Sequence, residues 1–272
     1  MSQTVRVPDA NPHVSRTSLF LLAAGFFMFA IGASVLSWIP ALSSLEFVLQ
    51  SLGPVLVVIA LLIGWRIHVA RWGWWTFILF LAGILAYGAV WLPYAIAPEI
   101  LGSEMATQRG FLTAGVSYLC AATGLFLLMA RGQRQLSPRG QRGHLTPSAT
   151  FTQLLLLALG VLLNGVDLIW VGPTGSKLQE FSLMIIGWAL ILVSAILSRK
   201  LLTARFGRPA AVVIILSVLT YWLHFFLDVL PSWVDPEWRQ SLHVMGAAFM
   251  LAAIAFILVA TRKSTDKTSS RR

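Results

Sequence analysis

The chain has few of the residues that catalysis and metal binding commonly use. Only 11% of its 272 residues are charged, whereas soluble globular domains contain about 25%. It has one cysteine, Cys120, which excludes an internal disulfide, a CxxC redox pair and a cysteine-rich zinc site. It also lacks a P-loop, an HExxH motif, a DxxxD prenyltransferase pattern and a serine nucleophile elbow. The sequence therefore leaves open whether the protein is an enzyme, and it names no cofactor.

Long hydrophobic runs dominate instead, because 57% of the residues are hydrophobic. Eight stretches are long enough to cross a hydrocarbon core of about 30 Å as helices. They are apolar on every face, without the alternation of a membrane β-barrel. The sequence thus predicts an all-α integral membrane protein with eight transmembrane helices. The predicted spans are residues 18–39, 47–65, 74–96, 111–130, 152–171, 181–198, 209–231 and 241–261.

Lysine and arginine gather on one side of the predicted membrane. Of the 20, 17 lie in the two tails or in connections on the same side as the tails, and only Arg109, Lys177 and Arg239 lie opposite. The positive-inside rule places the rich side in the cytoplasm. Both termini are then cytoplasmic, as in a multi-pass protein of a cell (inner) membrane. We therefore interpret the net charge of +10 as a signal that orients the protein in the lipid bilayer, and we expect no nucleic-acid partner.

A tandem repeat is visible when the second half of the sequence is aligned with the first at one fixed offset. The pairs that match under this offset are Glu46 with Glu180, Gly53 with Gly187, Arg71 with Arg205, Gly73 with Gly207, and Tyr87 with Tyr221. Four spans return the chain to its starting side, so both copies insert in the same orientation and a cavity between them is expected. The predicted parts are a cytoplasmic tail (1–17), the first four-helix repeat (18–131), a cytoplasmic linker (132–149), the second repeat (150–263) and a tail (264–272).

Polar and ionisable residues inside the predicted spans define a candidate binding site, because such residues are costly in lipid. These residues all lie in the second repeat, and the matching positions of the first repeat hold no histidine or carboxylate. Helical spacing places several of them on common faces near the outer leaflet, so we expect one polar pocket open to the outside. Its candidate residues are Asn164, Asp167, Tyr221, His224, Asp228 and His243.

A purely structural role for these residues stays open. A carboxylate about one turn from the headgroups can reach water, and a histidine–aspartate pair can lock helices together. The repeated glutamates, Glu46 and Glu180, are open to the same two interpretations. They can form an acidic pair at the outer mouth, or each can stabilise the N-terminus of its helix.

Three functions fit these features. The first is binding or translocation of a small solute or of protons through the pocket, since histidine titrates near neutral pH. The second is a membrane-embedded haem or metal redox protein that uses His224 and His243 as ligands. The third is a non-catalytic assembly or immunity factor with a membrane-protein partner or a homo-oligomeric state.

The overall plan resembles that of the haem A synthases. The shared features are two four-helix halves, cytoplasmic termini and a glutamate, Glu46, at the first outer loop. The resemblance implies haem-linked chemistry at histidines on even-numbered helices. His243 lies on the eighth span, whereas the second, fourth and sixth spans contain no histidine.

The predicted topology can be tested with reporter fusions. A reporter in the 132–149 linker should be active in the cytoplasm, and one in the turn at residues 40–46 should be active only outside it. Reporters that place both segments on the same side would contradict the eight-span arrangement.

Overall fold

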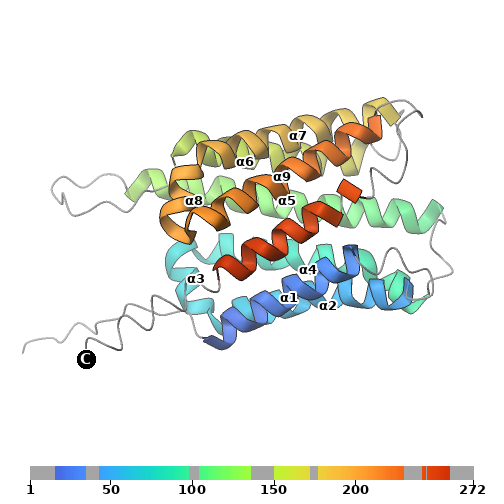
Figure 1. Cartoon of the computed structure of the whole chain (residues 1–272), viewed down its shortest axis with the longest axis horizontal. Helices are drawn as coiled ribbons and strands as arrows, with labels where there is room; N and C mark the ends of the chain where they lie inside the picture. Colours follow the sequence, from blue (N-terminus) through green and yellow to red (C-terminus); the bar gives the residue numbers. More distant parts are fainter. Residues whose placement is uncertain are drawn as a thin grey trace, which may run out of the picture.

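The described part of the chain consists almost entirely of helices. A computed structural model describes residues 16–34, 43–97, 104–135, 150–171, 177–229, 241–242 and 244–257. These residues contain no strand, which confirms the all-α prediction for this part of the chain. The long helices lie roughly side by side along one axis (Figure 1).

The helices follow the predicted spans closely, with two additional short helices. In chain order they are α1 (Arg16–Ser34), α2 (Ser43–Ile63), α3 (Trp65–Trp72), α4 (Trp74–Ile96), α5 (Glu104–Gln135), α6 (Phe151–Val166), the π-helix η4 (Asp167–Val171), α7 (Lys177–Leu197), α8 (Arg199–Phe206) and α9 (Arg208–Val229). A further helix, Val244–Ile257, is called the C-terminal helix below. The predicted fifth span is not uniformly α-helical, because its last turn widens into η4 at Asp167.

Several helices have the length and composition of membrane spans. Five qualify within the described residues: Leu45–Ile63, Trp74–Ile96, Gln108–Ala130, Phe151–Val171 and Arg208–Leu227. Three more apolar helices are shorter there: Thr17–Gly32, Ser182–Leu197 and Val244–Ile257. The chain therefore has the helices of a multi-pass membrane protein. Each of the eight predicted spans overlaps one of these helices, and the count of eight crossings stays a prediction.

Two short helices, α3 and α8, each precede a long helix. Helices α3 and α8 are equally long, and they begin at matching positions of the two halves, Trp65 and Arg199. Each ends at a glycine in the left-handed region, Gly73 with φ 90° and Gly207 with φ 88°. Only glycine adopts this backbone readily, so the glycine lets the chain reverse from a short helix into the next long one. The bounds of α2 and α7, and the starts of α4 and α9, are related by the same offset.

Glycines bring the first two long helices of each half into close contact. A Cβ at Gly25 of α1 would lie 2.6 Å from the carbonyl oxygen of Gly53 on α2. A Cβ at Gly160 of α6 would likewise lie 2.5 Å from the carbonyl oxygen of Gly187 on α7. Small residues allow this approach of backbones, which matters in lipid because dispersion contacts then hold the helices together.

A buried serine hydroxyl supports the same crossing in each half. Ser18 Oγ on α1 donates to the carbonyl oxygen of Ala60 on α2 at 2.7 Å. In the other half the direction is reversed, because Ser194 Oγ on α7 donates to the carbonyl oxygen of Gln153 on α6, also at 2.7 Å. Such hydrogen bonds contribute about 0.6 kcal/mol each between membrane helices.

The two halves meet along α5 and α6. These helices cross where Gly115 and Gly165 face each other. A Cβ placed on either glycine would lie 3.1–3.2 Å from the carbonyl oxygen of the other. On the opposite side, α9 contacts the C-terminal helix through Ser217 Oγ, which donates to the carbonyl oxygen of Gly246 at 2.9 Å. Figure 1 shows the C-terminal helix between α9 and α1. The helices thus surround a central region rather than packing around a single helix.

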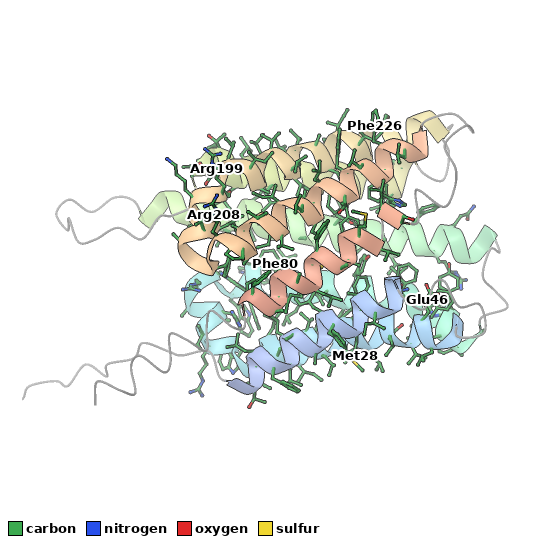
Figure 2. All side chains as sticks on the ribbon, viewed as in Figure 1. Met28, Glu46, Phe80, Arg199, Arg208 and Phe226 are labelled. Carbon is green, nitrogen blue, oxygen red and sulfur yellow. The ribbon has the colours of Figure 1, made fainter. Side chains whose placement is uncertain are left out.

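Charged residues separate between the two ends of the molecule. Figure 2 shows Arg199 and Arg208 at one end and Glu46 at the other. The short helices α3 and α8 lie at the arginine end (Figure 1), which is called the basic end below. This distribution agrees with the charge asymmetry in the sequence, while the membrane side of each end stays a prediction.

We predict that Gly160→Ala destabilises the protein. The new methyl group would collide with a backbone oxygen of α7, which cannot move aside as a side chain can, and overpacking of this kind costs about 1–3 kcal/mol. Gly110→Ala is the matched control, because its Cβ meets only Tyr94 Oη at 3.6 Å and Val90 Cγ1 at 3.9 Å. Thermal unfolding in detergent should show a lower midpoint for Gly160→Ala alone. Equal midpoints for both variants would contradict a close α6–α7 crossing.

Candidate functional site

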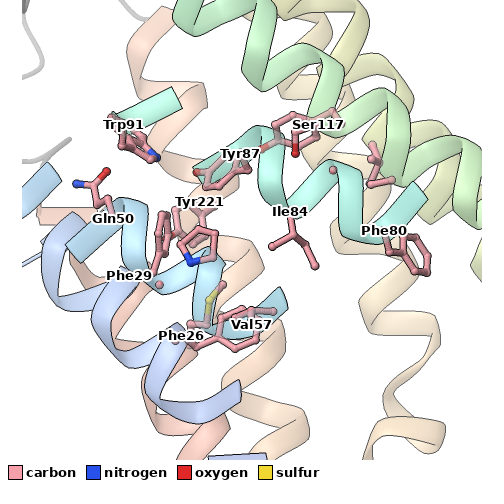
Figure 3. Close-up of a pocket in the computed structure, with 18 of the residues that line it drawn as sticks. Phe26, Phe29, Gln50, Val57, Phe80, Ile84, Tyr87, Trp91, Ser117 and Tyr221 are labelled. Carbon is pink, nitrogen blue, oxygen red and sulfur yellow. The ribbon is translucent and has the colours of Figure 1, made fainter. Parts of the chain in front are cut away.

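A cavity of about 910 Å³ occupies the region between the two halves. Helices α1 to α5 of the first half line it, together with α6, α7, α9 and the C-terminal helix of the second. Figure 3 shows Gln50 and Trp91 at one end, Phe80 at the other, and Tyr87 and Tyr221 between them. Phe80 and Trp91 lie three helical turns apart on α4, so this wall is about 16 Å long.

Equivalent positions of the two halves face the same cavity. The offset between matching positions is larger by one for α1 and α6 than for the later helices, as the paired glycines Gly25 and Gly160 indicate. The pairs with both members in the lining are Phe26 with Val161, Pro54 with Trp188, Tyr87 with Tyr221, and Trp91 with Phe225. The cavity therefore lies where corresponding surfaces of the halves meet.

Aromatic rings form most of the wall and brace one another. Trp188 of α7 stacks on Tyr221 of α9 with centroids 5.4 Å apart, and its ring also stacks on Phe225 at 5.8 Å. Across the cavity, Phe29 of α1 contacts Tyr87 of α4 at 5.5 Å. Ring pairs in these geometries gain about 0.5–1.5 kcal/mol beyond burial, so the wall is rigid and mainly apolar.

Three tyrosines converge on the middle of the cavity. Tyr87, Tyr118 and Tyr221 all line it, and they are three of the four tyrosines in the chain. Because a hydroxyl both donates and accepts hydrogen bonds, this group supplies adaptable polar contacts within an otherwise apolar space.

The end of the cavity near Glu46 carries its strongest polar groups. Gln50 is only 2% exposed, and its Nε2 donates to Oε1 of Glu46, one helical turn earlier, at 3.0 Å. The Oε1 atom of Gln50 and the indole nitrogens of Trp91 and Trp188 are buried without a hydrogen-bond partner in the described part of the chain. Unpaired buried polar atoms are costly, so these atoms favour a bound molecule with matching polar groups.

The predicted site residues divide between the cavity and its surroundings. Tyr221 and His224 line it, and the His224 ring contacts Phe225 edge-on at 5.1 Å. Asn164 and Asp167 are 0% and 1% exposed and do not belong to the lining. The structure thus brings two of the six predicted residues together in this space. His243 and the side chains of Asp228 and Glu180 lie outside the described residues.

Asn164 and Asp167 are instead enclosed by neighbouring helices. The Oδ1 atom of Asn164 occupies the space in front of Gly187, where any Cβ would collide with it. Asp167 begins η4, and its backbone N–H reaches the carbonyl oxygens of Leu163 and Asn164. The absence of a side chain at Gly187 explains how an asparagine can be fully buried beside α7. Helical spacing alone does not reveal such a neighbour.

Sequence reasoning missed most of the first half's contribution to the cavity. Gln50 and Trp91 gave no signal, because single polar or aromatic residues near span ends are ordinary interfacial residues. Tyr87 did carry one, since it matches Tyr221 under the repeat offset. Glu46 was predicted to lie at an outer mouth, and the structure places it in the cavity lining.

Of the two candidate haem or metal ligands, His224 lines the cavity and His243 lies outside the described residues. Among the described residues, no group of three or more histidine, cysteine, aspartate or glutamate side chains comes together.

No family model matches the chain, and no curated protein and no solved structure is significantly similar to it. The fold and the cavity therefore carry the functional argument.

At the basic end of the molecule, α3 contributes Trp72 to the cavity lining. His68, one turn earlier, stacks on Trp72 at 4.6 Å and also faces Phe77 at 6.2 Å. Partial burial, and then the nearby Arg71, lower the pKa of His68 from its ordinary value of 6.5. His68 is therefore neutral at neutral pH, which suits a ring packed between aromatic faces.

This lowered pKa predicts a pH-dependent stability. The unfolded chain binds a proton at His68 more readily than the folded protein, so stability falls as the pH drops through 6.5 and toward the lower folded-state pKa. Thermal unfolding measured on both sides of that value should show the decline, and His68→Phe should reduce it. An unchanged pH dependence in His68→Phe would contradict this assignment.

Proposed function

We propose that the protein binds a small, mainly apolar solute in the central cavity and moves it across the membrane. The observation that carries this proposal is a cavity of about 910 Å³ lined by aromatic rings from both halves, with unpartnered polar atoms at one end. Ligand pockets commonly have volumes of about 300–1,000 Å³, apolar walls and a few polar groups that orient the ligand.

The lining favours an organic solute over a bare inorganic ion. A small ion would need several oxygen or nitrogen ligands to replace its hydration shell, whereas most residues here present hydrocarbon or aromatic surface. Hydrogen-bonding groups near Gln50 and the three tyrosines can orient a polar group on the solute. His224 adds an imidazole ring from the second half to the lining.

The repeat supplies a route for movement. We propose eight spans in two parallel four-helix halves, with both termini in the cytoplasm of a cell-membrane protein. The coincident helix bounds and the paired lining positions support this arrangement. In transporters built from parallel repeats, the binding site lies between the halves, and rocking of one half against the other exposes it alternately.

Filling the cavity should abolish solute binding without unfolding the protein. Ser117 faces the cavity from α5 (Figure 3), and Ser117→Trp places a large ring in the space. Val116→Trp is the matched control, because the neighbouring side chain is 41% exposed on the outer surface. We expect binding of a neutral apolar fluorescent amine, 1-aminoanthracene, to fall on the order of tenfold or more in Ser117→Trp only.

The purified wild-type protein should enhance the fluorescence of this probe saturably in detergent. Equal thermal midpoints for the two variants would show that the loss comes from the cavity rather than from unfolding. If the wild type binds no probe, or if both variants bind as well as the wild type, the proposed solute site is wrong.

A further inference from the structure

We infer that the solute is a lipophilic organic cation, with the carboxylate of Glu46 as its counter-charge. This inference rests on the proposed function and adds the charge of the ligand. It follows from how the described lining residues are distributed: aromatic faces fill the wall, a single carboxylate lies among them, and no lysine or arginine does.

The carboxylate is held in place at one end of the cavity. Gln50 Nε2 donates to Glu46 Oε1, which orients the acid on the same helix. The carbonyl oxygen of the Gln50 side chain is buried and has no partner among the described residues. The carboxylate of Glu46 therefore supplies the formal negative charge at this end of the cavity, and the Gln50 amide fixes its orientation.

The aromatic wall favours positive charge for a separate reason. The faces of tryptophan, tyrosine and phenylalanine rings carry negative electrostatic potential, and they attract organic cations with about 0.5–2 kcal/mol each when solvent is excluded. Trp91, Tyr87 and Phe29 all line the cavity together with Glu46. An organic cation would satisfy the rings and the carboxylate at once, whereas an organic anion would be repelled by both.

The lysines and arginines whose side chains the structure describes do not line this site. Arg66, Arg71, Arg199 and Arg208 belong to or flank α3 and α8, at the basic end of the molecule. None of them is part of the cavity lining. At the Glu46 end, the described residue Arg109 is exposed on α5 and is also absent from the lining. Within the described lining, no basic side chain of the protein therefore neutralises the carboxylate.

Two probes of equal shape and opposite charge test this inference. Tetraphenylphosphonium and tetraphenylborate have nearly the same size, so the cavity should discriminate between them by charge alone. We expect tetraphenylphosphonium to displace 1-aminoanthracene from the wild-type protein and to bind on the order of tenfold or more tightly than tetraphenylborate.

Substitutions at Glu46 identify the counter-charge. Glu46→Gln should weaken tetraphenylphosphonium binding on the order of tenfold, as expected for loss of one charged contact, while 1-aminoanthracene still binds and shows that the variant is folded. Glu46→Asp should retain part of the affinity. Glu180→Gln, at the corresponding position of the second half, is the control and should bind as the wild type does.

The outcomes separate this inference from the proposed function. If 1-aminoanthracene binds but tetraphenylphosphonium does not, or if Glu46→Gln binds the cation unchanged, the cation assignment is wrong and the solute site stands. Equal losses in Glu46→Gln and Glu180→Gln would also overturn the assignment to Glu46. If neither probe binds the wild type, both proposals fail.

Discussion

The described structure depends on how helices can associate in lipid. Backbone groups in a hydrocarbon environment must pair within their own helix, and lipid leaves little hydrophobic force to press helices together. Close packing at small residues provides an alternative. The Gly25–Gly53 and Gly160–Gly187 contacts bring backbones within van der Waals distance, and buried serine hydroxyls bridge the same helix pairs. These two crossings shape each half.

This close packing is compatible with an open centre. Because α1 and α2 approach through glycine, and α6 and α7 do the same, their larger side chains project elsewhere, some of them into the space between the halves. Phe26 and Phe29 follow Gly25 on α1, and Trp188 follows Gly187 on α7; all three line the cavity. The glycine crossings and the aromatic cavity are therefore two results of the same side-chain arrangement.

The two halves of the predicted repeat differ in the chemistry of their cavity-facing residues. The position of Gln50 in the first half is occupied by Met184 in the second, and that of Phe29 by Asn164. As a result, the polar end of the cavity comes mainly from the first half, whereas His224 comes from the second. Such asymmetry suits a binding site between related halves, since one ligand presents different groups to each side.

The sequence alone determined the helical class and the approximate positions of the long helices, because hydrophobic length is a local property of the chain. It did not determine which polar residues face the cavity. Asn164 and His224 are both polar residues within apolar helices, yet the first is enclosed beside Gly187 and the second lines the cavity. Only the tertiary structure decides between these outcomes, because the rotation of each helix is fixed by the neighbours it packs against.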